Sequence, residues 1–144
     1  GKYGVGAKNS SVGLSLLRAT ERPDPDADRG YHDFCYLIFP HGGSFLDAQI
    51  NRRAFEYNIP LLSADSFRLP VALPNELFLQ AVKLSENGKQ VIFRLSEQDG
   101  RRGTLSLGRK MIKMNLLEEP VEQIETLSYR PFELITLALN REEI

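Results

Sequence analysis

Short apolar runs separated by turn-forming residues dominate this 144-residue sequence, and no long window repeats its apolar residues at helical spacing. Evenly spaced short strands with tight turns between them predict an all-β fold, an antiparallel β-sandwich. The runs that we expect to form strands are residues 12–17, 34–39, 77–84, 91–95, 103–107, 111–117 and 132–139.

Two dipeptides predict sharp turns between these strands. Asn87-Gly88 precedes residues 91–95, and Asp99-Gly100 precedes residues 103–107. Asparagine, aspartate and glycine tolerate the positive φ angles that tight hairpin turns require. We therefore predict a hairpin at the first dipeptide and a second turn of this kind at the other.

The run at residues 34–39 is apolar on both of its faces. Such a run predicts a strand that is buried between two layers. Cys35 lies inside it and is predicted to be an inert core thiol. Because Cys35 is the only cysteine, an internal disulfide is impossible, which favours a reducing compartment.

Residues 44–58 depart from the strand pattern. Leu46, Ile50, Ala54 and Tyr57 recur roughly on one side of a helix, so a short helix or an irregular crossover is expected there. Within residues 69–74, Pro70 and Pro74 bracket an apolar stretch, and we place a domain boundary at this point. The predicted division is therefore 1–72 and 75–144.

Charge and hydropathy exclude several classes of partner. The 18 basic and 19 acidic residues leave a formal net charge of −1, so we expect no binding to nucleic acid or to an anionic membrane surface. No stretch approaches the roughly 18 apolar residues of a membrane span. The sequence opens at Gly1 without an initiator methionine, inside a stretch that resembles a strand, so we expect it to be a piece of a longer protein.

Asp24, Asp26 and Asp28 occupy alternate positions, as the aspartates of a calcium loop do. A calcium loop also needs a glycine at its sixth position and a bidentate glutamate at its twelfth, where this chain has Arg29 and Cys35. A solvated turn, in which the aspartates cap backbone N–H groups, is therefore favoured over a calcium site.

The remaining residues with metal or nucleophile chemistry do not form a pattern. Two histidines, His32 and His41, and one cysteine fall short of a zinc site. On a strand, His32 and Cys35 would point to opposite faces because they are three residues apart. Neither residue type nor spacing therefore predicts a metal site within the chain.

Adjacent carboxylates occur at 118–119 and 142–143. A glycosidase needs two carboxyl groups that face each other across a cleft, whereas neighbours on a strand point apart. We predict that these glutamates are surface charges. The residues alone thus indicate no catalytic centre.

Ordered segments along the chain carry a more specific signal. The most specific is Pro23-Asp24-Pro25-Asp26-Ala27-Asp28-Arg29-Gly30, which runs into His32-Asp33-Phe34. The others are Lys2-Tyr3-Gly4 with residues 14–19, Asn58-Ile59-Pro60-Leu61, residues 93–97 before Asp99-Gly100, residues 115–119 and residues 130–137. Together they resemble the C-terminal region of the glycoside hydrolase family 38 α-mannosidases.

The resemblance implies the end of a large galactose-mutarotase-like super-sandwich in residues 1–72 and a small terminal sandwich in residues 75–144. It implies a parent enzyme that hydrolyses α-mannosidic bonds with retention and with one zinc ion. The family's catalytic and zinc-binding residues lie in N-terminal catalytic and helical domains that this chain lacks. No catalytic residue, metal ligand or cofactor is therefore assigned to the chain, and its expected partners are those domains and, through them, the α-mannoside.

The sequence of residues 23–30 most resembles that of the bacterial members of the family, which implies a cytoplasmic parent. That subset includes enzymes that act on mannosylglycerate or its phosphorylated form, so a mannosylglycerate hydrolase is an alternative parent.

The resemblance also implies that Arg29 and its neighbour Asp28 bind substrate, because the corresponding loop of the family packs toward the catalytic domain. A guanidinium donates several hydrogen bonds to sugar hydroxyls or to a carboxylate. The alternative is that Arg29 only pairs with Asp26 or Asp28 and stiffens the loop.

Two other functions remain open from the sequence. A free-standing carbohydrate-binding module would need exposed aromatic rings, for which Tyr3, Tyr31, Tyr57 and Tyr129 are scattered candidates in a chain without tryptophan. An assembly surface is the second, since a sandwich that lacks some of its strands exposes apolar edges.

Overall fold

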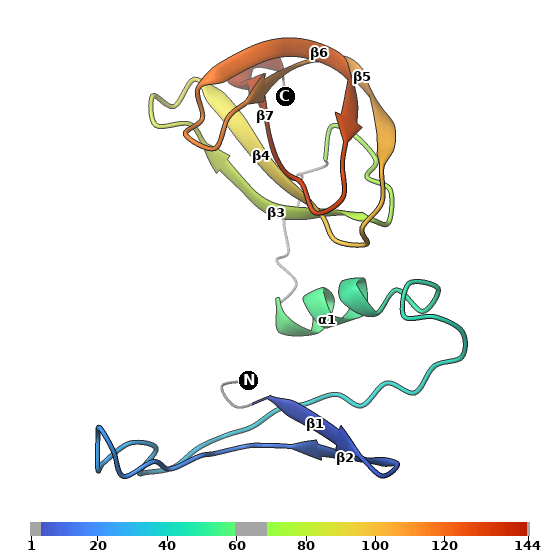
Figure 1. Cartoon of the computed structure of the whole chain (residues 1–144). Helices are drawn as coiled ribbons and strands as arrows, with labels where there is room; N and C mark the ends of the chain where they lie inside the picture. The colour runs from blue at the N-terminus through green and yellow to red at the C-terminus, as the bar shows by residue number, and fades with distance from the viewer. Residues whose placement is uncertain (1–3, 60–68, 144) are drawn as a thin grey trace. The chain divides into compact units, whose positions relative to one another are not determined.

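A computed structural model describes residues 4–59 and 69–143 of the chain (Figure 1). The chain divides into two compact units, Gly1–Pro40 and His41–Ile144. The predicted boundary between residues 72 and 75 would separate two sandwiches of a larger parent protein, and it stays a prediction.

The first unit contains a two-stranded antiparallel hairpin, β1 (Val5–Lys8) and β2 (Ser11–Leu14). Asn9 and Ser10 connect the strands, and both have positive φ, 52° and 60°. Two consecutive positive φ angles are the geometry that matches the twist of a tight hairpin. Strand β2 is shorter than the predicted run at 12–17, and Tyr3 and residues 60–68 lie outside the described residues.

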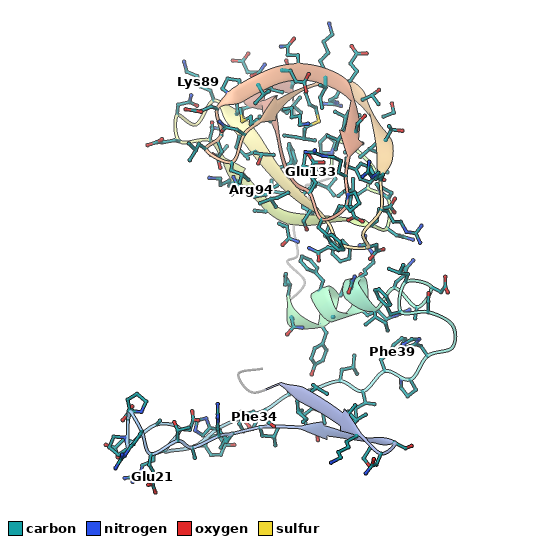
Figure 2. The ribbon with its side chains drawn as sticks, in the orientation of Figure 1. Glu21, Phe34, Phe39, Lys89, Arg94 and Glu133 are labelled. Atoms are coloured by element: carbon teal, nitrogen blue, oxygen red, sulfur yellow. The ribbon has the colours of Figure 1, made fainter. Side chains whose placement is uncertain are left out.

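The prediction of a buried strand at residues 34–39 is wrong for this chain. These residues form no strand, and Phe34 and Phe39 keep more than a third of their surface exposed (Figure 2). Cys35 is exposed too, so its prediction as a core thiol fails as well. The physical reason is that a run apolar on both faces needs a layer on each side, and one two-stranded hairpin supplies neither.

The second unit is an antiparallel five-stranded sheet with the order β3-β4-β7-β5-β6. It confirms the predicted all-β sandwich. Its strands are β3 (Leu77–Leu84), β4 (Gln90–Glu97), β5 (Gly103–Met114), β6 (Pro120–Tyr129) and β7 (Leu134–Asn140), and a short 3-10 helix, η1 (Arg141–Glu143), follows.

A bend in β5 turns this single sheet into two layers. Residues 103–106 pair only with β6, whereas residues 112–114 also pair with β7. The register shifts between Ser106 and Met111, and Gly108 there has φ 66°. The bend lets the first half of β5 and the end of β6 cover β3, β4 and β7.

The core lies between these two layers. Its buried side chains come from both, so neither layer is closed without the other. From β3, β4 and β7 come Leu77, Phe93, Leu95, Ile135, Leu137 and Leu139, and from β5 and β6 come Leu107, Met111, Leu127 and Tyr129.

The predicted turns have mixed outcomes. Asn87-Gly88 forms the hairpin between β3 and β4, with φ 70° at Gly88. Asp99-Gly100 is a turn with φ 73° at Gly100, but it joins β4 to β5, which are not neighbours in the sheet. It therefore crosses between the layers and does not close a hairpin.

The strands after this turn differ from the prediction. The runs at 103–107 and 111–117 belong to one bent strand, β5, which ends at Met114. Strand β6 was missed because its apolar residues, Val121, Ile124 and Leu127, are three apart and hide the two-residue period. As an edge strand it exposes most of its first half, so it needs no alternation there.

The expected helix is α1 (Ile50–Asn58), and it docks on the sandwich by a side other than the predicted stripe. Asn51 Nδ2 donates to the Gln98 carbonyl oxygen (2.8 Å) and to Asp99 Oδ1 (3.1 Å). Of the predicted stripe, Ile50, Ala54 and Tyr57 lie on roughly the opposite side of the helix, and Leu46 lies in the turn before it.

Aromatic contacts complete this docking. The Arg52 guanidinium lies 4.8 Å from the centre of the Phe78 ring and donates to the Asn75 carbonyl oxygen (2.9 Å). Phe55 meets Phe78 edge to face with ring centres 5.4 Å apart. Hydrogen bonds and ring contacts, and not an aliphatic stripe, thus hold α1. No helix among the described residues has the length and apolar character to cross a membrane.

We predict that Gly103→Ala destabilises the sandwich. A Cβ at this position would overlap the Tyr129 hydroxyl, which donates to Glu76 Oε1 (2.8 Å). Overpacking of this kind costs about 1–3 kcal/mol, measured as the free energy of unfolding in urea. Gly42→Ala is the matched control, because a Cβ there meets only open space. Equal stabilities of the two variants would contradict this account.

Candidate functional site

The loop at residues 23–30 is shaped by its own aspartates. Asp24 Oδ1 accepts a hydrogen bond from the Asp26 N–H (3.0 Å), and the Asp26 carbonyl oxygen accepts one from the Arg29 N–H (3.2 Å). Both are local turn contacts of the kind predicted for a solvated aspartate-rich turn. The loop therefore has a defined backbone before any ligand or partner contacts it.

Arg29 forms an ion pair within this loop. Its Nη1 lies 2.8 Å from Asp26 Oδ1, and the Arg29 side chain is 74% exposed. An exposed ion pair contributes about 0–1 kcal/mol. The pairing therefore orients the guanidinium, and breaking it to contact another group would cost little free energy. Substrate binding by Arg29 stays a prediction.

Asp28 ties the loop to the residues around it. It has φ 60°, its Oδ2 accepts a hydrogen bond from the Ala19 N–H (3.2 Å), and its carbonyl oxygen lies 2.9 Å from His32 Nε2. These contacts give Asp28 a positioning role in the loop. Substrate binding by Asp28 stays a prediction.

The two histidines considered for metal binding contact different neighbours. The His32 ring stacks on Phe34 with ring centres 5.9 Å apart, and His41 Nδ1 lies 3.4 Å from the Gly42 carbonyl oxygen. Within residues 4–59 and 69–143, no three histidine, cysteine, aspartate or glutamate side chains converge as metal ligands would.

A buried carboxylate that the sequence did not single out organises one end of the sandwich. Glu97 is 2% exposed. Its Oε1 accepts hydrogen bonds from the N–H groups of Asp99 (2.9 Å) and Arg101 (2.8 Å), and its Oε2 accepts from Gly100 (3.0 Å) and Phe132 (2.7 Å). A carboxylate offers about four acceptor positions, and backbone donors fill all of them.

The pKa of Glu97 follows from this geometry. Burial raises the pKa of the carboxyl group, but the four backbone N–H groups outweigh burial, so the pKa lies below its ordinary value. With its acceptor positions filled from the backbone, Glu97 is a structural anion that joins two turns. The signal in the sequence was a glutamate two residues before Asp99-Gly100.

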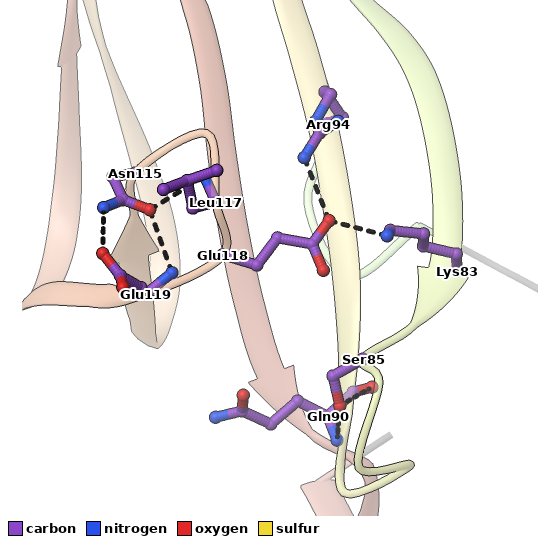
Figure 3. A network of polar contacts seen from close by, with 8 residues as sticks. All are labelled: Lys83, Ser85, Gln90, Arg94, Asn115, Leu117, Glu118 and Glu119. Carbon is purple, nitrogen blue, oxygen red and sulfur yellow. Dashed lines mark hydrogen bonds and ion pairs between the residues drawn. The ribbon is translucent and has the colours of Figure 1, made fainter.

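A second organised turn lies at the other end of β4 (Figure 3). Asn115 Oδ1 accepts hydrogen bonds from the N–H groups of Leu117 (2.9 Å) and Glu119 (3.0 Å), and Asn115 Nδ2 donates to Glu119 Oε2 (2.7 Å). Glu118 has φ 65° and points away from Glu119. The two adjacent carboxylates thus point apart, as predicted, although they lie in a turn and not on a strand.

Glu118 pins this turn to the outer face of the sheet. Its Oε1 lies 2.7 Å from Lys83 Nζ and 3.0 Å from Arg94 Nη2 (Figure 3). The Glu118 side chain is 18% exposed, which strengthens such pairs relative to those at a fully solvated surface. Glu118 is therefore committed to both cations as a structural contact between β3, β4 and the turn.

The described aromatic candidates for sugar stacking come from different parts of the fold. Tyr129 is buried in the core, where burial and the neighbouring Glu76 raise its pKa to about 12, so it is wrong as a stacking residue. Tyr31 lies in the first unit and Tyr57 on α1 in the second.

The chain is similar in sequence to a glycosidase-associated domain and to several α-mannosidases. The model of the glycosyl hydrolases family 38 C-terminal beta sandwich domain matches residues 76–137. Human "Alpha-mannosidase 2C1" is 33% identical over 96% of this chain and 16% of its own length. "Alpha-mannosidase G" of Dictyostelium discoideum is 26% identical over 94% of the chain and 15% of its own length.

A yeast relative, "Alpha-mannosidase" of Saccharomyces cerevisiae, is 40% identical over 40% of this chain and 5% of its own length. The chain thus spans about a sixth or less of the curated relatives that it matches. These relatives are eukaryotic, so they do not support the predicted resemblance to bacterial members. No solved structure matches the chain significantly.

We predict that Glu97→Gln removes about 3 kcal/mol of stability, because the amide nitrogen faces backbone donors and leaves them unpaired. The pKa is lowered by folding, so the stabilisation is complete above the unfolded value of about 4.3 and is lost as pH falls through the folded value. Urea unfolding between pH 7 and 2 should show this loss in the wild type and a flatter profile in the variant.

Glu122→Gln on the exposed start of β6 is the control for this measurement. It should leave both the stability at pH 7 and the acid dependence unchanged. An acid dependence that is as steep in Glu97→Gln as in the wild type would show that another carboxylate is responsible.

Proposed function

Because residues 76–137 match the family 38 C-terminal beta sandwich domain, we propose that the whole chain is the C-terminal part of a larger α-mannosidase. The observation that carries this proposal is the alignment with the human α-mannosidase over 96% of the chain, which includes both compact units. In this proposal the chain supports the enzyme's catalytic domain and takes no part in bond cleavage itself.

The exposed apolar residues of the first unit support this proposal. A groove of about 590 Å³ lies within that unit and is lined by Val5, Val12, Leu14, Leu16, Tyr36, Leu37 and Ile38. Large exposed apolar surfaces mark contacts with other parts of a protein or with partners. We propose that further strands of the parent's large sandwich cover this groove and bury the run at 34–39.

The proposed reaction is retaining hydrolysis of an α-mannosidic bond, with zinc bound in the parent's catalytic domain. The chain's own contribution to the substrate would come from Arg29 and Asp28. The Asp26 carboxylate orients Arg29, and the Ala19 N–H fixes Asp28, so the loop is arranged before substrate arrives. A cytoplasmic location, a bacterial parent and a preference for mannosylglycerate are further proposals, which rest only on the resemblance of residues 23–30 to bacterial members of the family.

We predict that the full-length parent hydrolyses a nitrophenyl α-mannoside, whereas the purified 144-residue chain does not, with or without added zinc. The reason is that the adjacent carboxylates of Glu118 and Glu119 point apart, whereas a glycosidase needs two that face each other, and that no three metal ligands converge among the described residues. Release of nitrophenol is the measurement. Turnover by the purified chain would refute its supporting role, and an inactive parent would refute the assignment as a mannosidase.

We also predict that Arg29→Ala in the parent lowers kcat/KM about tenfold or more while the melting temperature stays within about 1 °C. A hydrogen bond from a charged group contributes about 1.5–3 kcal/mol to binding, whereas the exposed pair with Asp26 adds little to stability. Arg18→Ala, an exposed arginine of the same unit, is the control and should keep wild-type kinetics. Wild-type kinetics in Arg29→Ala would exclude substrate binding by this loop.

A further inference from the structure

Phe132 has a strained backbone and an exposed ring at the same time. Its φ is 58°, a left-handed conformation that is rare for a bulky residue. Such strain costs about 1–2 kcal/mol and persists only where the surroundings enforce it. Yet 74% of the residue is exposed, so the fold gains little by burying the ring.

The surroundings do enforce this conformation. The Phe132 N–H donates to the buried Glu97 Oε2 (2.7 Å), and Glu133 closes the turn through its N–H to the Arg130 carbonyl oxygen (3.2 Å). The ring lies over Gly100, where a Cβ would come within 3.1 Å of it. These three contacts, two of the backbone and one of the ring, thus restrain an aromatic side chain that faces solvent.

This ring sits beside a contact that already brings another segment to the sandwich. The turn under Phe132 contains Gly100, and the two preceding residues, Gln98 and Asp99, accept the hydrogen bonds of Asn51 on α1. Helix α1 precedes the sandwich in the sequence, so this end of the sandwich already contacts another segment of the second unit. The Phe132 turn therefore continues an existing docking surface.

We propose that Phe132 and the Gly100 turn beneath it dock the terminal sandwich onto the part of the parent that lies outside these 144 residues, with the ring in an apolar pocket there. The proposal rests on the proposed function, because it requires a larger parent, of which the chain would be about 16% as it is of the human relative. A rigid, preorganised aromatic ring is the kind of side chain that dominates the energetics of an interface.

The opposite end of β4 offers a matched comparison. Leu117 lies on the Asn115–Glu119 turn and is 80% exposed. It lines a pocket together with Ser85 and with Gln90, the first residue of β4. Glu97, which holds Phe132, is the last residue of the same strand. Leu117 and Phe132 are thus apolar, similarly exposed and at different ends of one sandwich.

Hydroxyl-radical footprinting of the full-length parent tests the proposal. The oxidation rate of each side chain is compared between native and urea-unfolded protein, with the core residue Phe93 as the reference for a covered ring. We expect Phe132 to be protected about as strongly as Phe93, tenfold or more, and Leu117 to be protected less than twofold. Protection of Phe132 no greater than that of Leu117 overturns the proposal, and so does equal strong protection of both.

Nitrophenyl α-mannoside hydrolysis by the same preparation separates the two ideas. An active parent with an unprotected Phe132 refutes the docking surface and leaves the proposed function standing. An inactive parent with a protected Phe132 refutes the mannosidase assignment and supports the docking surface.

Discussion

The terminal sandwich depends on one buried carboxylate. Glu97 stands at the end of β4 and binds four backbone N–H groups from two turns that are far apart in the sequence. A carboxylate without these donors could not stay ionised in the core, and the donors without the carboxylate would be buried unpaired. The crossing from β4 to β5, the turn before β7 and the docking of α1 therefore share one electrostatic origin.

The two compact units differ in how far they bury their apolar side chains. The second unit closes a core between two layers, because β5 bends and contributes to both. The first unit has one hairpin and an apolar run that stays exposed, although that run is the most apolar stretch of the sequence. The described residues therefore cover the apolar side chains of the second unit and leave those of the first unit exposed.

The all-β class and most strands of the second unit could be predicted, because their apolar runs and turn residues are local signals. Strand β6 and the bend of β5 could not, since both depend on which strands meet and the spacing of apolar residues does not encode it. The run at 34–39 misled for the same reason, as its burial needs layers that residues 4–59 and 69–143 do not supply. The local bonds of the aspartate loop followed from residue type, whereas Glu97 and Phe132 required the fold.

The bend at Gly108 also bears on how the protein can change over evolutionary time. Residues 107–110 already have no partners on β6, so a residue inserted between Ser106 and Met111 would lengthen this bulge and leave both paired halves of β5 in register. A residue inserted among the paired residues 103–106 would instead shift that half of β5 against β6 by one position and turn its side chains to the other face. Length variation among homologues should therefore collect at the bend and in the outer turns, such as the Asn87-Gly88 hairpin, and be absent from the paired residues of this strand.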